Sequence, residues 1–576
     1  MNQFHPLCFA FAVATTLSIV LPSCAAGTAK EEEEDVPLVL LVSLDGFRYD
    51  YLNSSALLPN LWSIAKDGVH FANGYRVQMS TVTTPNHYSI VTGLHEESHG
   101  IVGNRFFDPV IGDYYDYWNF TGNSTRYNES KKAYWYKGDP IWLRNENGGE
   151  QRRSGSMLWP TGDAHVNNQL PFKTRTWADF GNLSSWKKDF DELVAWYMDD
   201  EQPINFGMFY VSHPDEIEHL NGSWSLPTLD MLRELDKLIG HMKSQLKQAG
   251  LWDRMNVIFA TDHGHENVSY PSHQIPLLDY FQLIQEWNKT GGLIYDREQS
   301  IHVLNKSDVH PVFTTLRAAF ERDYPEGGVQ VMLKRDFPNF RYFWSDTPRI
   351  GDILTLPKLG YRLNYHETRK ELAQKPSRMT SEHGYFPDYA SMRGYLVLHG
   401  PAFKRGLVLK RFDIENIDLY PLMCHLLSIT CAPCNGSLER IEVVLRSSDL
   451  ALGLQGRMVS FASDHRIQLV VIFCMLIPFT AMLCYLMACL MTKQHGGTNK
   501  LKKLTAAATT RKRAANMDGY HRLETGMPTA TGNEAVSRGT TASSRAAADL
   551  ANGTKTKEKP LLYLGQQPRN SSEDEF

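Results

Sequence analysis

Hydrophobic and polar positions along residues 36–445 follow the rhythm of an α/β fold. Between residues 205 and 261 two apolar runs are separated by a stretch in which apolar side chains recur at helical spacing from Leu229 to Leu246, and Gly250 supplies a stop signal. The almost continuous apolar runs, typical of strands buried on both faces, are 36–44, 205–212, 255–261 and 395–399. This succession predicts a doubly wound, mostly parallel central sheet. The weakly periodic residues 110–175 are interpreted as an insertion over that sheet.

Apolar stretches also lie near both ends of the chain. The first is short and ends in small residues, which predicts a secretory signal peptide at 1–26. Residues 467–491 carry no charged side chain and are long enough to cross a bilayer core about 30 Å thick, with Lys and Arg following on the cytosolic side. We therefore expect a juxtamembrane linker at 446–466, a transmembrane helix at 467–491 and a disordered cytosolic tail at 492–576. The predicted protein is a single-pass type I protein of the plasma membrane, with endosomal cycling left open.

The composition of the predicted ectodomain agrees with a secreted surface. The formal net charge of −5 gives no indication of binding to a nucleic acid polymer. Only Cys424, Cys431 and Cys434 face the lumen, so at most one internal disulfide forms, and the odd thiol is free or links two chains into a dimer. Glycosylation is predicted at the Asn-x-Ser/Thr sites Asn53, Asn119, Asn123, Asn128, Asn182, Asn221, Asn267, Asn288, Asn305 and Asn435.

Residue types that bind metals accompany the predicted strands. Ligands of parallel sheets bind outside the carboxyl ends of the strands, so these side chains are expected to converge on one site. Carboxylates and imidazoles without cysteine suit a catalytic zinc site. Each fragment alone has a structural alternative, such as a helix cap, a surface pair or an ordinary turn. The residues are Asp45, Asp215, His219, Asp262, His263 and His383.

A proline-containing turn at residues 81–93 supplies hydroxyl groups that these ligands could activate. A threonine hydroxyl is a poor nucleophile at neutral pH, and it needs a neighbouring base or a metal. The turn alone is an ordinary structural feature. Only its combination with the metal-ligand types indicates catalysis.

Taken as a set, these motifs resemble the ectonucleotide pyrophosphatase/phosphodiesterase family of the alkaline-phosphatase-like superfamily, and the chain looks most similar to the short type I membrane-anchored members. The resemblance covers roughly residues 36–440 and rests on 45–52, 83–93, 97–104, 261–264 and 383–385.

The resemblance implies a two-zinc hydrolase for phosphodiester or pyrophosphate bonds of nucleotides or dinucleotides. Thr83, two residues before Pro85, would be the nucleophile and form a phospho-threonine intermediate, and Asn104 would donate to a phosphoryl oxygen. The implied ligands are Asp215, His219 and His383 for one zinc, and Asp45, Asp262, His263 and the Thr83 oxygen for the other.

The chain departs from the family pattern near the site. Thr84 stands where the family commonly has an aromatic residue that stacks on the base of the substrate, and Phe180 is either the opposite stacking face or ordinary core. His213 replaces a usual Glu, Glu218 a usual Gly and His265 a usual Met. These changes leave the implied ligands intact and leave the substrate preference open.

Three other classes compete with a nucleotide hydrolase. A sulfatase needs Cys or Ser in a Cys/Ser-x-Pro-x-Arg string, and residues 83–87 do not match it. A phosphodiesterase for choline-bearing lipids or lysophospholipids would differ mainly in pocket residues. A catalytically silent cell-surface binding ectodomain is the non-enzymatic alternative, and the complete set of metal-ligand types argues against it.

Overall fold

The computed structural model describes residues 36–118, 125–289, 292–295, 299–411 and 413–446. The predicted signal peptide, membrane span and tail lie outside these residues, as do Asn119 and Asn123. Within the described part of the chain, no helix is long and apolar enough to cross a membrane.

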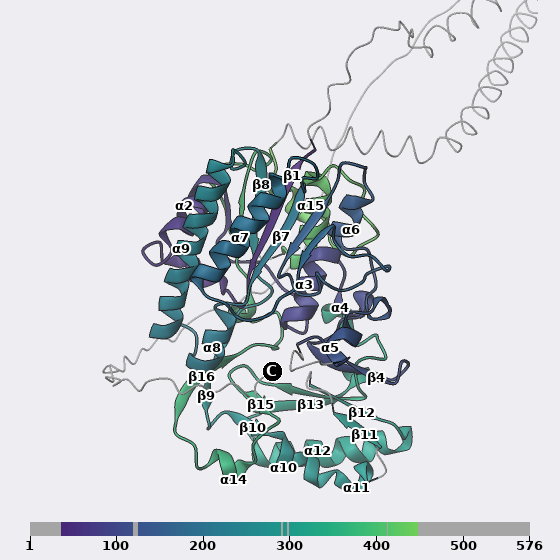
Figure 1. Ribbon diagram of the computed structural model, residues 1–576. Helices are drawn as coiled ribbons and strands as arrows, with labels where there is room; N and C mark the ends of the chain where they lie inside the picture. The colour runs from purple at the N-terminus through teal and green to yellow at the C-terminus, as the bar shows by residue number, and fades with distance from the viewer. Residues whose placement is uncertain (1–35, 119–124, 290–291, 296–298, 412, 447–576) are drawn as a thin grey trace, which may run out of the picture. The chain divides into compact units, whose positions relative to one another are not determined.

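The core of the fold is an eight-stranded sheet that is mostly parallel (Figure 1). Its central strand β1 pairs in parallel with β7 on one side and β8 on the other, and β7 continues in parallel to β5 and β6. The α/β class predicted from the apolar runs is therefore confirmed. In spatial order the strands are β18 (Leu407–Leu409), β2 (Val69–Phe71), β17 (Val397–His399), β8 (Met255–Ala260), β1 (Leu38–Leu44), β7 (Phe206–Val211), β5 (Ser154–Met157) and β6 (Lys173–Arg175).

The apolar run at 395–399 predicted one strand correctly but not its direction. β17 pairs antiparallel with both β8 and β2. A strand that is buried on both faces is apolar whichever way it runs, so the pattern contains no information on direction.

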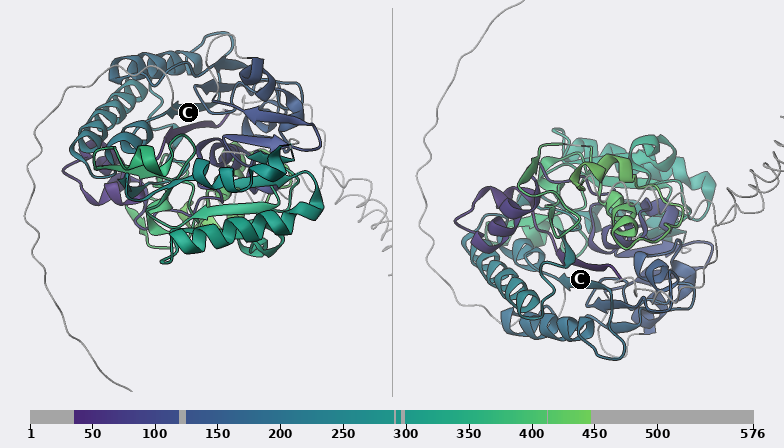
Figure 2. Two further views of the ribbon diagram at one scale, coloured as in Figure 1. Left: turned by 90° about the horizontal axis from the view of Figure 1, so that it is seen from below. Right: turned by 90° about the horizontal axis from the view of Figure 1, so that it is seen from above.

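Helices cover both faces of the sheet (Figures 1 and 2). Alternate residues of β1 point to opposite faces: Val39 and Leu41 belong to one apolar core, and Leu40 and Val42 to the other. The second core is closed by α2 (Pro59–Asp67), α7 (Leu183–Tyr197) and α9 (Leu226–Gln248), and the first includes residues of α3 (Thr83–Thr92), α6 (Ile141–Glu146) and α15 (Leu419–Leu426). Helix α9 begins after Ser225, whose side chain caps Thr228 N, and ends just before Gly250, as predicted.

Interpreting residues 110–175 only as an insertion was wrong, because this segment supplies β5 and β6 to the central sheet. The sequence of β5 is Ser-Gly-Ser-Met, which has no apolar run, yet all four residues are buried. A Cβ at Gly155 would lie 2.7 Å from Ile204 Cδ1, so glycine is needed for this close packing. The same segment also contains β4 (Asp113–Asp116), which forms a hairpin with β3 (Arg105–Asp108), and α5 (Thr125–Ser130).

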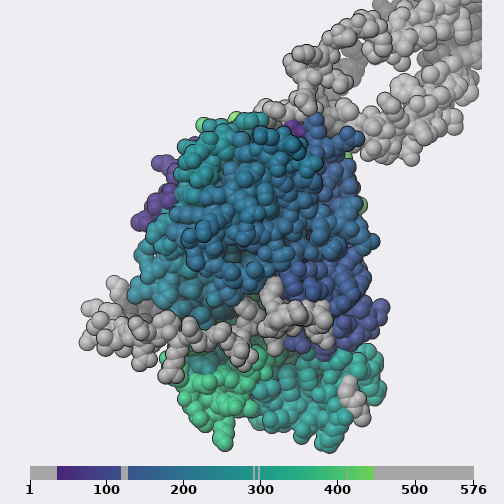
Figure 3. Space-filling view, viewed as in Figure 1, coloured from purple at the N-terminus to yellow at the C-terminus, as the bar shows by residue number. Residues whose placement is uncertain are grey.

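A second, antiparallel sheet was not predicted. Its strands are short, and it has its own apolar core with α10 (Leu277–Leu283) and α12 (Val309–Asp323); the teal segment in Figures 1 and 3 contains it. In spatial order the strands are β11 (Leu293–Tyr295), β12 (Ser300–Val303), β14 (Ile353–Pro357) and β13 (Val329–Leu333).

A two-stranded antiparallel ribbon lies beside α8 (Asp215–Asn221). It consists of β9 (Glu266–Tyr270) and β16 (Arg378–Glu382), and Glu266 pairs with Glu382 at its end. Continuing this register by one residue places His265 opposite His383. The ribbon therefore directs two histidines toward the carboxyl ends of the central strands.

Candidate metal centre and nucleophile

Three neighbouring strands bring carboxylates to one edge of the central sheet. Asp45 directly follows β1, and Asp262 follows β8 after one intervening residue. Asp215 is the first residue of α8, which begins shortly after β7. Because β8, β1 and β7 are adjacent and parallel, their carboxyl ends meet at the same edge, as the sequence predicted. Gly46, at φ +67°, donates its N–H to Asp262 Oδ1 at 3.2 Å and so ties two of these ends together.

The first group of candidate ligands consists of Asp215, His219 and His383. Asp215 Oδ1 lies 3.4 Å from His219 Nε2 and 3.5 Å from His383 Nε2, and the two Nε2 atoms lie 3.2 Å apart. Two ligands bound to one tetrahedral zinc, each about 2.0–2.1 Å from the ion, are separated by about 3.3 Å. The three donor atoms therefore have the spacing of a metal site.

Hydrogen bonds on the far side of both imidazoles orient them for metal binding. His219 Nδ1 donates to the carbonyl of Ser381 at 3.2 Å, and His383 Nδ1 donates to the carbonyl of Thr81 at 2.8 Å. When both imidazoles are neutral, both Nε2 atoms carry lone pairs that face each other, an arrangement that a cation stabilises.

The second group consists of Asp45, Asp262 and His263, all of them buried. His263 Nε2 lies 3.6 Å from Asp45 Oδ1 and 3.0 Å from Asp262 Oδ2. Both carboxylate oxygens are buried without a hydrogen-bond partner among the described residues. Buried, unsatisfied anionic oxygens beside an imidazole indicate a cation site. The second oxygen of Asp45 accepts a hydrogen bond of 2.5 Å from the Tyr210 hydroxyl, which orients the carboxylate.

The two groups adjoin, and their charges interact. The rings of His263 and His383 stack with their centroids 3.8 Å apart. Burial, together with the nearby carboxylates of Asp262 and Asp215, raises the pKa of Asp45 well above its usual value. Burial alone would lower the pKa of His219, but the carboxylates of Asp215 and Glu382 raise it to about 9. This excess of negative charge in a buried site favours binding of divalent cations.

Thr83, the predicted nucleophile, is the first residue of α3, beside the second group. Its hydroxyl oxygen lies 3.4 Å from His263 Nε2, and its side chain is buried. Its carbonyl accepts a hydrogen bond of 2.9 Å from His87 Nδ1, and His87 Nε2 lies 2.8 Å from the Ser43 hydroxyl. The helix N-terminus favours negative charge at this position. Pro85 is tolerated there because it lies in the first turn of the helix.

Asn104 lies beside the predicted nucleophile, where the resemblance places it. Its Oδ1 accepts a hydrogen bond of 2.9 Å from the backbone N–H of Thr84. Because the amide oxygen is held by this bond, the orientation of the amide NH2 group is set by the start of α3.

The two predicted substrate-binding residues lie in different surroundings. Thr84 is fully buried, and its hydroxyl accepts a hydrogen bond of 2.7 Å from the Trp118 indole. Phe180 is half-buried. The ring centroid of Trp177 lies 5.3 Å from that of Phe180 on one side and 5.3 Å from that of Trp118 on the other, so the three rings form an aromatic row. The row places aromatic side chains close to α3, where the sequence alone suggested a loss of aromatic surface.

One polar residue of the site was missed as a functional residue. His265 is completely buried, and its Nε2 lies 2.5 Å from Asp215 Oδ1, within the first group of candidate ligands. The available signal was its position in the string Asp262-His263-Gly264-His265, where the family usually has Met.

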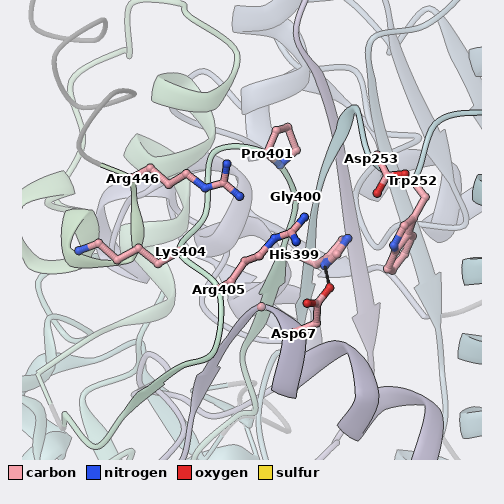
Figure 4. A pocket seen from close by; sticks show the side chains of 10 residues that line it. Asp67, Trp252, Asp253, His399, Gly400, Pro401, Lys404, Arg405 and Arg446 are labelled. Carbon is pink, nitrogen blue, oxygen red and sulfur yellow. Dashed lines mark ion pairs between the residues drawn. The ribbon is translucent and has the colours of Figure 1, made fainter.

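A separate pocket of about 120 Å³ lies away from the metal-ligand groups (Figure 4). His399, at the carboxyl end of the antiparallel strand β17, stacks on Trp252 with a centroid distance of 4.1 Å, and its Nδ1 lies 3.9 Å from Asp67 Oδ2. Since β17 runs opposite to β8, its carboxyl end lies at the other edge of the sheet. None of the candidate metal ligands lines this pocket.

Comparisons with known proteins show which family the chain is similar to. Residues 39–386 match the model of the family described as type I phosphodiesterase / nucleotide pyrophosphatase. The chain is 32% identical to the bis(5′-adenosyl)-triphosphatase enpp4 of Xenopus laevis over 410 residues, which is 71% of this chain and 82% of that protein. It is 30% identical to the human ectonucleotide pyrophosphatase/phosphodiesterase family member 5 over 432 residues, covering 75% of this chain and 83% of the relative.

Solved structures of family member 5 share the fold. The murine protein superposes with a TM-score of 0.60 at 26% identity, and the human protein with 0.60 at 29%; each covers 71% of this chain and 100% of the compared chain. One murine structure is an inactive threonine-to-alanine variant in complex with AMP, with a TM-score of 0.60 at 26% identity and the same coverage.

Proposed function

This chain belongs to the type I phosphodiesterase / nucleotide pyrophosphatase family of hydrolases, and we propose that it cleaves phosphodiester or pyrophosphate bonds of nucleotides or dinucleotides outside the cell. The observation that carries the proposal is the position of the Thr83 hydroxyl. It lies at the start of α3, 3.4 Å from His263 Nε2, beside two groups of metal-ligand side chains.

Thr83 is the proposed nucleophile. Its oxygen forms a bond to phosphorus as the bond between phosphorus and the leaving oxygen breaks, and water then hydrolyses the phospho-threonine ester. When bound, two zinc ions would lower the pKa of the Thr83 hydroxyl and compensate the charge on the phosphoryl oxygens. Asn104, oriented through the backbone N–H of Thr84, donates from its NH2 group to a phosphoryl oxygen.

The residues present fit two metal ions. Asp215, His219 and His383 would hold one ion, and Asp45, Asp262 and His263 would hold the other together with Thr83. The identity of zinc is proposed from the ligand chemistry, because oxygen and imidazole donors without sulfur suit catalytic zinc sites.

Nucleotides are the proposed substrates because relatives of the chain are named for them. One is a bis(5′-adenosyl)-triphosphatase, and another has been solved with AMP. The aromatic row of Trp118, Trp177 and Phe180 would offer stacking surface to a base. The extracellular location and the membrane anchor are proposed from the sequence, from the apolar segment 467–491 and the glycosylation sites.

The test uses the full-length protein purified with zinc. It compares hydrolysis of p-nitrophenyl thymidine 5′-monophosphate, diadenosine triphosphate and lysophosphatidylcholine, each with and without a chelator. We expect chelator-sensitive cleavage of the two nucleotide substrates. Cleavage of the lipid alone would assign the protein to the lysophospholipid phosphodiesterases. No cleavage by the folded, zinc-loaded protein would contradict the proposal and favour a binding ectodomain.

A further inference from the structure

His265 is held tightly inside the first group of candidate ligands. It is completely buried, and its Nε2 lies 2.5 Å from Asp215 Oδ1. Its Nδ1 lies 3.1 Å from the Ser381 hydroxyl. A Cβ at Gly46 would come within 2.9 Å of two atoms of the His265 ring, so the ring can lie there only because residue 46 is glycine.

The distances separate His265 from the three other members of its group. The contacts among Asp215, His219 and His383 measure 3.2–3.5 Å, close to the spacing of about 3.3 Å between ligands of one tetrahedral zinc. The contact of 2.5 Å between His265 Nε2 and Asp215 Oδ1 is much shorter. It is somewhat shorter than the length of about 2.7 Å of a short N–H···carboxylate hydrogen bond, and it is too short for two ligands of one tetrahedral zinc. The geometry therefore makes His265 a partner of the ligand Asp215 and not a fourth ligand.

We propose that His265 is a positioning residue of the metal centre: its Nε2–H donates to the ligating carboxylate of Asp215, and its Nδ1 accepts from the Ser381 hydroxyl. The inference rests on the proposed metal-dependent function and adds a residue to it. Ser381 then serves two imidazoles, because its carbonyl also accepts from His219 Nδ1.

A second departure from the family pattern lies against the first. Glu218, where the family usually has Gly, is fully buried, and its Oε2 lies 3.9 Å from His265 Nδ1. Its two oxygens accept hydrogen bonds of 2.5 Å from the Tyr51 hydroxyl and 2.6 Å from the Ser223 hydroxyl. The two departures from the family pattern therefore lie next to each other in the buried region behind Asp215.

Loss of the donor at position 265 should weaken one metal site selectively. Residues that hold a ligating group in place typically change metal affinity about 10- to 100-fold when removed. His265→Met introduces the residue usual in the family and removes the N–H donor. His265→Gln is the matched variant, because the amide nitrogen of glutamine can occupy the place of Nε2 and donate to Asp215.

The experiment measures zinc stoichiometry and affinity of the full-length protein by chelator competition, for wild type, His265→Met, His265→Gln and Ser381→Ala. Cobalt-substituted samples are compared by visible absorption. We expect two zinc ions per wild-type chain. In His265→Met one of them should be held about 10- to 100-fold more weakly, His265→Gln should be close to wild type, and Ser381→Ala should lie between them. The cobalt spectrum of saturated His265→Met should keep the wild-type coordination number.

Three results would overturn the inference. These are unchanged zinc affinity in His265→Met, a His265→Gln variant as weak as His265→Met, or a lower coordination number in the cobalt spectrum, which would make His265 a direct ligand. If His265→Met does not fold, the comparison of His265→Gln and Ser381→Ala with wild type decides, and equal affinity in all three overturns the inference. Failure of wild type to bind two zinc ions would instead contradict the proposed function, so the two failures are distinguishable.

Discussion

The Trp118 indole N–H donates to the hydroxyl of Thr84, the residue that directly follows the predicted nucleophile, at 2.7 Å. This contact brings an aromatic ring next to the position where the family commonly carries one. We infer that Trp118 replaces part of the missing stacking surface.

The first prediction concerns this ring. Trp118→Ala should lower kcat/KM for diadenosine triphosphate about 5- to 150-fold relative to the base-free substrate bis(p-nitrophenyl) phosphate, because stacking on a base contributes about 1–3 kcal/mol. Using the ratio of the two substrates cancels losses from misfolding. Trp118→Phe, which keeps an aromatic face and loses only the hydrogen bond to Thr84, is the control. A ratio that does not change in Trp118→Ala would exclude the ring from base recognition.

The second prediction concerns the nucleophile. Thr83→Ala should reduce hydrolysis by roughly 10³-fold or more, since it removes the attacking oxygen. Thr83→Ser keeps a hydroxyl at the same place and should retain measurable activity. Zinc content and melting temperature of both variants, measured beside the activity, should stay close to wild type. Full activity in the folded alanine variant would refute the mechanism.

The third prediction concerns the buried carboxylate of Asp45. In metal-free protein its charge is destabilising, because it is buried near Asp262 and Asp215. Without metal, Asp45→Asn should therefore be more stable than wild type by roughly 1–3 kcal/mol and should melt at a higher temperature. With saturating zinc the order should reverse, because the variant lacks one ligand. Calorimetry of both proteins with and without zinc checks this crossing, and the same order under both conditions would contradict a metal site at Asp45.

The fourth prediction concerns pH. Burial lowers the pKa of His95 to about 4, and the ring stacks on Phe343 and contacts Gln78 Oε1 at 2.8 Å. The unfolded chain takes up this proton near pH 6.5. Between pH 6.5 and about 4 the unfolded state therefore binds more protons, and the stability due to neutral His95 is complete above pH 6.5 and is lost as the pH falls through this window.

Between pH 6.5 and 5, the free energy of unfolding should fall by on the order of 2 kcal/mol because of His95 alone. His95→Asn keeps a donor to Gln78 without titrating, so its stability should fall less over the same range. Urea unfolding of metal-free wild type and His95→Asn at pH 7 and pH 5 measures how much unfolding free energy each protein loses. Equal losses in the two proteins would contradict this role of His95.

The fifth prediction separates a structural role from glycosylation at Asn267. Its Oδ1 accepts from the N–H of Ser223 at 2.7 Å and its side chain is half-buried, whereas Asn53 is exposed. Asn267→Gln should cost about 1–3 kcal/mol of stability, because the Ser223 amide loses its partner. Ser269→Ala removes the same glycosylation site but keeps the Asn267 side chain, so it should cost less than about 0.5 kcal/mol. Equal melting temperatures of the two variants would contradict this role.

Much of the central fold and of the candidate metal centre was predictable from the sequence. The apolar runs that became β1, β7 and β8 predicted a parallel core, and the polar residues that follow them predicted where Asp45, Asp215 and Asp262 would meet. These predictions succeed because burial on two faces and the end of a strand both leave local signals.

Other features depend on contacts between distant segments. β5 lies in the sheet because Gly155 admits Trp196 and Ile204, which no local pattern reveals. The position of His265 depends on the pairing of β9 with β16, which are far apart in the chain. The short strands of the second sheet carry few residues each, and their burial comes from packing against α12. Such long-range packing overrides local propensity.

The ribbon of β9 and β16 also has an evolutionary consequence. Its two strands are joined by residues 271–377, which include the whole second sheet, so this sheet occupies the position of a loop in a single hairpin. A change in the length of a connection costs little free energy when the ends stay paired. Insertions and deletions within that segment can therefore accumulate between related genes while His265 and His383, at the base of the hairpin, keep their places.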